Sequence, residues 1–113
     1  MPLIQIAALP QPRSVRDRIL DAVVQAAAQS LGRPAESIWA TWQEIPEGGY
    51  SVGGARPENQ PAATHPPIVR VYGRRSPQEL SAVAEAIERV FQDGLGLDPF
   101  VIVEPAPHAE TSS

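Results

Sequence analysis

One pattern, a strand followed by a helix and a second strand, occurs twice in the sequence, and this repeat limits the fold more than any other feature. An Arg-Ser step opens a helix at position 13 and again at position 75, 62 residues later, and Glu44 and Glu104, 60 residues apart, each close a second strand. We interpret this as an internal duplication. A strand-helix-strand unit makes its two strands parallel through a right-handed crossover. Two units side by side predict an α/β (α+β) fold with a four-stranded sheet and both helices on one face.

The first unit begins with a nearly continuous apolar stretch over residues 3–9, which predicts a buried strand. Ser14 is the expected N-cap of the helix that follows, and Gly32 is its expected end. Residues 37–45 predict the second strand, and the glycine-rich stretch 48–54 predicts a hairpin.

The second unit repeats this order. Residues 68–72 predict a strand, and residues 76–79, Ser-Pro-Gln-Glu, form a capping box with proline at the first helical position. Gly94 and Gly96 are the expected end of this helix. Residues 100–103 predict the fourth strand.

The repeat predicts a single domain over residues 1–104, followed by a flexible tail at 105–113. Within the domain, unit one covers 2–54, a polar and Pro-rich linker covers 55–66, and unit two covers 67–104. The face of the sheet without helices would stay uncovered. Since an uncovered apolar face normally packs against another subunit, we expect an oligomer.

Composition excludes several classes of function. The sequence contains no cysteine, which excludes disulfides, thiolate nucleophiles and cysteine-based metal sites. His65 and His108 lack the spacing of a metal site, so we expect neither a metal nor a cofactor. A net charge of -4 gives no general attraction to nucleic acid or to an anionic membrane. The first residues lack the features of a signal or membrane segment, so we expect a cytoplasmic protein.

Four features together resemble the tautomerase superfamily. They are Pro2 directly after the initiator Met, an apolar strand, a helix opened by Arg-Ser, and the Gly-Tyr-x-x-Gly-Gly stretch at 49–54. The first half is similar to 4-oxalocrotonate tautomerase. The two-unit length is similar to the cis-3-chloroacrylic acid dehalogenases, malonate semialdehyde decarboxylases and macrophage migration inhibitory factor. The resemblance implies that fold, a homotrimer, and a pocket built on the amino-terminal proline once Met1 is removed.

The amine explains why such a proline is a candidate catalytic residue. A free amino-terminal proline is a secondary amine, and an α-amino group titrates near pH ~8 in its reference state. An apolar pocket beside arginines disfavours the charged form and lowers the pKa. Pro2 could then take a proton from one atom of an enol and return it to another without a cofactor. The alternative is that Pro2 only begins a strand.

Three arginines are candidates for binding a substrate carboxylate. Arg13 falls where the tautomerases carry a carboxylate-binding arginine, and Arg74 and Arg75 occupy the equivalent place in the second unit. The guanidinium fork suits this task because it binds a carboxylate through two hydrogen bonds. The alternative is that they are exposed arginines beside helix starts.

Trp39, Tyr50 and Glu104 complete the candidate site. Trp39 stands where 4-oxalocrotonate tautomerase has a second arginine, which argues against the dicarboxylate reaction of that enzyme and favours a monocarboxylate or a different reaction. Tyr50 matches the aromatic pocket residue of the family, or else packs on the sheet. Glu104 is the candidate for activating water in a dehalogenase-like reaction, with Glu44 as second choice. The alternative for both acids is solvation at a strand end.

Three functions remain open on the sequence. The first is a tautomerase that acts on a small carboxylated 2-hydroxydienoate or enolpyruvate. The second is a dehalogenase-, hydratase- or decarboxylase-like lyase that acts on a small unsaturated acid. The third is a trimeric binding module without catalysis, which the tryptophan at position 39 favours.

Overall fold

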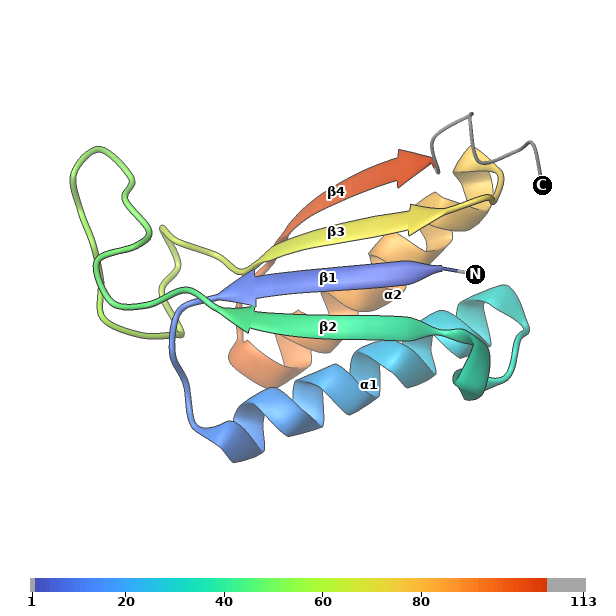
Figure 1. Ribbon diagram of the computed structural model, residues 1–113, viewed down its shortest axis with the longest axis horizontal. Coiled ribbons are helices and arrows are strands. Elements are labelled where there is room, and N and C mark those ends of the chain that lie inside the picture. Colours follow the sequence, from blue (N-terminus) through green and yellow to red (C-terminus); the bar gives the residue numbers. More distant parts are fainter. Residues whose placement is uncertain (1, 106–113) are drawn as a thin grey trace.

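The computed structural model describes residues 2–105 and shows the expected order of elements (Figure 1). The elements are β1 (Leu3–Ala8), α1 (Arg13–Leu31), the short 3-10 helix η1 (Ala35–Ser37), β2 (Trp39–Glu44), β3 (Ile68–Gly73), α2 (Pro77–Leu95) and β4 (Phe100–Pro105). Pro105 ends β4 instead of beginning a tail. Met1 and residues 106–113, which hold His108 and the rest of the expected tail, lie outside the described residues.

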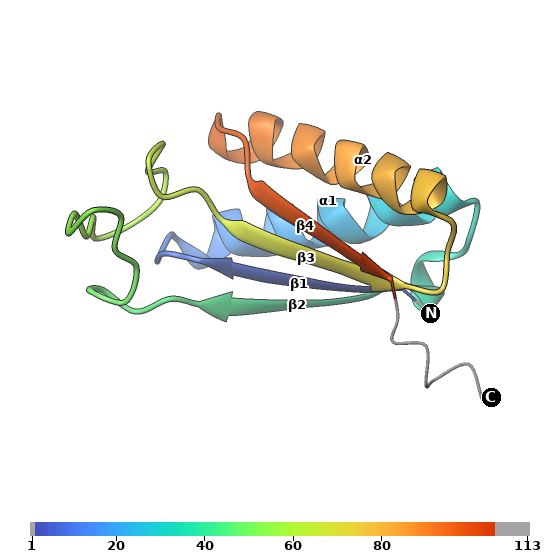
Figure 2. The ribbon, with the colours of Figure 1, turned by 90° about the horizontal axis from the view of Figure 1, so that it is seen from above.

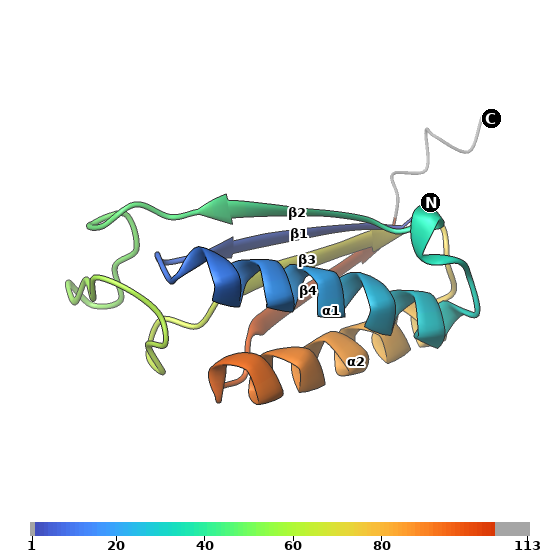
Figure 3. The same ribbon diagram turned by 90° about the horizontal axis from the view of Figure 1, so that it is seen from below.

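The two strand-helix-strand units form one four-stranded sheet with the order β2-β1-β3-β4. Strand β1 is parallel to β2, β3 is parallel to β4, and the units meet where β1 runs antiparallel to β3. Both helices cover the same face of the sheet (Figures 2 and 3). The predicted fold class is therefore confirmed. Because the units run in opposite directions, α1 and α2 begin at opposite ends of the sheet (Figure 1).

Alternation along the strands separates a buried face from an open face. Ile4, Ile6, Val69 and Val71 point toward the helices and are at most 2% exposed. They pack against apolar residues of the two helices, which include Ile19, Val23, Val83, Ile87 and Phe91. The residues of opposite parity form the surface that we call the open face: Leu3, Gln5, Ala7, Trp39, Thr41, Gln43, Ile68, Arg70, Tyr72, Phe100, Ile102 and Glu104.

The two units begin in the same way. Pro2 and Pro67 are both buried and stand directly before β1 and β3. The carbonyl of Pro2 accepts a hydrogen bond from the amide of Trp39 at 3.1 Å, and the carbonyl of Pro67 accepts one from the amide of Phe100 at 2.8 Å. Trp39 and Phe100 are each 58% exposed on the open face. The duplication predicted from the sequence thus extends to the hydrogen bonds at the strand starts.

The start of α1 differs from the prediction. Pro12 occupies the N-cap position without a side-chain cap, and Arg13 is already helical, so the expected cap at Ser14 is wrong. The carbonyl of Pro12 accepts from the amides of Val15 and Arg16, so Ser14 is the second helical residue, two positions after the cap. In α2, by contrast, the predicted capping box of Ser76 is present. The two Arg-Ser steps are therefore not equivalent in position.

The end of α2 is at Gly96 and not at Gly94. Helix α2 continues to Leu95, and Gly96 takes the left-handed conformation with a φ of 72°. Gly94 has a different role, since a Cβ atom there would lie 2.9 Å from Cγ1 of Ile19. This glycine allows α2 to approach α1 closely.

The predicted hairpin at 48–54 is reduced to a single bridge between Val52 and Ala55, whose amides and carbonyls bond to each other. The next hydrogen-bonded pair outward would join Tyr50 to Pro57. Proline has no N–H to donate, so the ladder stops there.

The linker after this bridge is folded around a buried histidine. His65 is 1% exposed, and its Nε2 lies 2.7 Å from the carbonyl oxygen of Ala55. Its Nδ1 lies 2.9 Å from the hydroxyl of Thr64. The side-chain amide of Gln60 donates to the carbonyl of His65 at 3.0 Å. These polar groups bond to one another, so the linker has an ordered arrangement around His65.

In the described part of the chain, no helix has the length and apolar character that crossing a membrane requires.

Candidate functional site

Pro2 is buried at the start of the central strand β1, next to the end of β3. Gly73, which closes β3, lies beside Pro2 and beside Arg75 and Leu80. A Cβ atom on Gly73 would lie 3.7 Å from Cα of Pro2, 3.7 Å from Cγ of Arg75 and 3.5 Å from Cδ2 of Leu80. We call this region the Pro2 end of the sheet. It contains the proline, an apolar side chain and a guanidinium-bearing side chain within a short distance of one another.

Arg75 is the predicted arginine that the chain places beside Pro2. Its side chain is 22% exposed, and its Nη1 atom pairs with Oε2 of Glu79 at 3.5 Å. Arg74 lies at the same end of the sheet and is exposed. One chain thus places the side chain of Arg75 near Pro2, the residue whose nitrogen is the candidate amine.

Trp39 and Glu104 lie at the Pro2 end but on the open face. Leu3 is paired with Trp39 on one side and with Tyr72 on the other, and Tyr72 is paired with Glu104. These residues therefore form one row across the sheet. The guanidinium of Arg70 lies 3.6 Å from Oε1 of Glu104 and donates to the hydroxyl of Tyr72 at 3.4 Å. The Glu104 carboxylate thus faces a cation on the opposite side of the sheet from the buried Pro2 ring.

Arg13 and Tyr50 lie at the other end of the sheet. Strand β1 has six residues, which separates Pro2 from the start of α1 by about 20 Å at roughly 3.3 Å per residue. The hydroxyl of Tyr50 donates to the carbonyl of Pro66 at 2.9 Å, and its ring meets His65 edge-on. Burial raises the pKa of Tyr50. Glu44, at the end of β2, is also at this far end. None of these side chains reaches Pro2 of its own chain.

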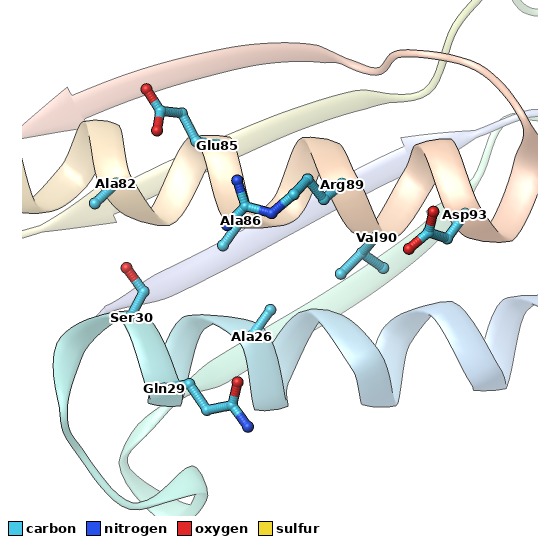
Figure 4. A pocket seen from close by; sticks show the side chains of 9 residues that line it. All are labelled: Ala26, Gln29, Ser30, Ala82, Glu85, Ala86, Arg89, Val90 and Asp93. Carbon is cyan, nitrogen blue, oxygen red and sulfur yellow. The ribbon is translucent and has the colours of Figure 1, made fainter.

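A groove of about 460 Å³ between the two helices lies apart from these residues (Figure 4). Small side chains such as Ala26, Ala82 and Ala86 line it, with Arg89 and Asp93 among its polar groups. None of the residues predicted for the site lines this groove. The residues predicted for the site therefore lie at the two ends of the sheet and not in this groove.

Three residues near the candidate site were not predicted from the sequence. Gly73 gave no signal, because a glycine after a strand usually indicates only a turn. Tyr72 could have been found by alternation, since it is two residues from Arg70 and therefore on the same face. Glu79 was identified only as part of a capping box. Its second contact has a signal in the sequence, because Arg75 and Glu79 are four residues apart at a helix start.

No protein-family model matches this sequence, and no curated protein matches it either. Solved structures match its fold. The protein Pt0534 inactivated by 2-oxo-3-pentynoate is 18% identical with a TM-score of 0.73, over 94% of this chain and 88% of that one. A wild-type fused 4-OT, described as a symmetric trimer, is 22% identical with a TM-score of 0.73, over 93% of this chain and 85% of that one.

A malonate semialdehyde decarboxylase is similar to the same extent. It is 16% identical with a TM-score of 0.71, over 96% of this chain and 87% of that one. Its decarboxylase and hydratase activities were studied with a variant in which its own amino-terminal proline is replaced by alanine. The likeness to all three structures covers both strand-helix-strand units. The chain therefore has the fold of the tautomerase superfamily.

Proposed function

We propose that this chain is a tautomerase that isomerises a small carboxylated enol, a 2-hydroxydienoate or an enolpyruvate, with the amino group of Pro2 after Met1 is removed. The observation that carries the proposal is the surroundings of Pro2. The proline is buried, and its Cα atom and Cγ of Arg75 each lie 3.7 Å from the point where a Cβ atom of Gly73 would sit. A buried amine beside a guanidinium titrates below its usual range, which suits a base that works near neutral pH.

The proposed reaction needs only these groups. The Pro2 nitrogen accepts the hydroxyl proton of the enol, and the resulting pyrrolidinium delivers a proton to carbon, so that the keto acid forms with no net change in atoms. Arg75 binds the carboxylate of the substrate and fixes its orientation. Leu80, which is 2% exposed and also next to Gly73, provides the apolar wall that keeps the amine partly dry.

The surroundings of Glu104 favour isomerisation over a lyase reaction. A water-activating carboxylate should face the substrate beside the proline. Glu104 instead pairs with Arg70 on the open face, away from the buried Pro2 ring. This arrangement supports a proton transfer by Pro2 alone.

We propose further that the active form is a homotrimer. The open face carries exposed Trp39 and Phe100, each 58% exposed, which a second copy would cover. Arg13 and Tyr50 lie too far from Pro2 of the same chain, so they would contribute only to the Pro2 end of a neighbouring copy. The fused 4-OT with the same fold is described as a trimer, which supports this arrangement.

Ultraviolet assays of the ketonisation of phenylenolpyruvate and 2-hydroxymuconate test the proposed function. We expect turnover above buffer that Pro2→Ala abolishes, and intact mass that shows the loss of Met1. Treatment with 2-oxo-3-pentynoate should add one label per chain, and peptide mapping should place the label on Pro2. Turnover that equals buffer, or that Pro2→Ala leaves unchanged, would contradict the proposal.

A matched pair of arginine variants tests the role of Arg75. Arg75→Gln should raise KM by at least tenfold, because one charge-assisted interaction with a carboxylate is lost. Arg33→Gln is the control, since Arg33 is exposed in the turn after α1. Equal KM values for the two variants would exclude Arg75 from carboxylate binding.

A further inference from the structure

Glu79 connects the start of α2 to the arginine beside Pro2. Its Oε1 atom accepts a hydrogen bond from the amide of Ser76 at 3.0 Å, and its own amide donates to the hydroxyl of Ser76 at 3.1 Å. These two bonds form the capping box and fix the carboxylate at the helix start. The second oxygen, Oε2, lies 3.5 Å from Nη1 of Arg75. One carboxylate therefore both caps the helix and contacts the guanidinium.

This contact restricts a side chain that would otherwise be mobile. A free arginine samples many rotamers, and ordering it on binding costs free energy. Cγ of Arg75 lies 3.7 Å from the point where a Cβ atom of Gly73 would sit, and the ion pair with Glu79 restrains the guanidinium end of the side chain. Among residues 2–105, Glu79 is the partner of this guanidinium, through Nη1, which leaves the other N–H groups for a two-point contact with a carboxylate.

We propose that Glu79 is a positioning residue that pre-orders Arg75 for the carboxylate of the substrate, an inference that rests on the proposed function. Glu79 does not touch the substrate. It acts through Arg75, so its loss should weaken the binding of substrate and leave the proton transfer at Pro2 unaffected.

Glu79→Gln separates the two roles of this side chain. The amide oxygen of glutamine can still accept from the Ser76 amide, while the charge that faces Arg75 is lost. We expect KM for phenylenolpyruvate to rise by about 2- to 12-fold, the range that corresponds to ordering one flexible side chain, with kcat within about twofold of wild type. The methyl ester of the same substrate, which has no carboxylate, should show no change in KM.

Ser76→Ala is the matched control. It removes the hydroxyl of the capping box and lowers stability, but it leaves both the Ser76 amide and the contact between Glu79 and Arg75 in place. Its KM should equal that of wild type.

The possible outcomes separate this inference from the proposed function. An unchanged KM in Glu79→Gln, an equal rise in Ser76→Ala, or an equal rise for the ester would overturn the role of Glu79 while turnover by Pro2 stands. If wild type shows no turnover that depends on Pro2, the proposed function and this inference fall together.

Discussion

The Cα atom of Pro2 lies 3.7 Å from the point where a Cβ atom of Gly73 would sit. At this distance a methyl group makes an ordinary van der Waals contact, so alanine fits at position 73 without a clash. The same methyl group would also contact Arg75 and Leu80. Gly73 therefore determines how much space remains beside the proline.

Gly73→Ala should fold normally and lose activity. Removing a glycine restricts the unfolded chain, so the free energy of unfolding should rise by about 0.4–1 kcal/mol. The extra methyl group narrows the proposed pocket, and kcat/KM should fall by about tenfold or more. Urea unfolding and steady-state kinetics measure the two effects. Unchanged kcat/KM would show that Gly73 does not border the site.

Gly94→Ala should lower stability and leave activity unchanged. A Cβ atom at this position would lie 2.9 Å from Cγ1 of Ile19, which is 1% exposed and cannot move away freely. Overpacking of this kind costs about 1–3 kcal/mol, and the gain in helix propensity offsets about 1 kcal/mol. We expect Tm to fall by roughly 4 °C, with kcat/KM unchanged. A rise in Tm would show that the two helices can separate at this contact.

The Glu79 carboxyl should make stability depend on pH in the acid range. The hydrogen bond from the Ser76 amide, helped by the Ser76 hydroxyl and the charge of Arg75, lowers the pKa of Glu79 from its ordinary value of 4.5. A lowered pKa in the folded state stabilises the fold fully above 4.5, and this contribution is lost as pH falls through the folded-state pKa. The difference in unfolding free energy between wild type and Glu79→Gln should therefore be constant from about pH 7 to pH 5 and decrease below that. A difference that grows on acidification would contradict this assignment.

Phe100→Lys tests whether a second copy covers the open face. Phe100 is 58% exposed on β4, and Val52 is 48% exposed in the loop after β2. If copies of the chain pack through the open face, a charge at position 100 should dissociate the oligomer, while Val52→Lys should leave it intact. Light scattering coupled to gel filtration reports the mass of each variant. Equal masses for wild type and Phe100→Lys would place the interface elsewhere.

His65→Leu should loosen the segment between β2 and β3. The substitution removes the part-buried hydrogen bond to the carbonyl of Ala55, which costs about 0.5–1.5 kcal/mol. Faster amide hydrogen exchange over residues 50–66 is the expected result. Thr64→Val, which removes only the bond to Nδ1, is the milder control. Exchange as slow as in wild type would show that other contacts hold this segment.

The fold could be predicted because its signals are local and repeated. The apolar run at 3–9, the strand pattern at 68–72 and the capping box at Ser76 each indicate one element without reference to the others. The start of α1 could not be placed in the same way. A serine near a helix start is a common cap, and only the hydrogen bonds of Pro12 show that the helix begins before Ser14.

The candidate site could be predicted only in part, because strand direction decides which residues meet. Arg13 and Arg75 look equivalent in the sequence, yet β1 and β3 are antiparallel and place them at opposite ends of the sheet. The second role of Glu79 and the closeness of Gly73 to Pro2 depend on contacts between segments. No periodicity in the sequence reports such contacts.

The matched starts of β1 and β3 limit where amine chemistry can occur. Pro67 holds the same place before β3 that Pro2 holds before β1, and each carbonyl accepts from the first residue of the partner strand. The nitrogen of Pro67, however, is bonded to the carbonyl carbon of Pro66 and is a tertiary amide without basicity. Under the proposed mechanism each polypeptide thus has a single proton-transfer centre. A second amino-terminal proline of this kind would require cleavage of the chain directly before Pro67.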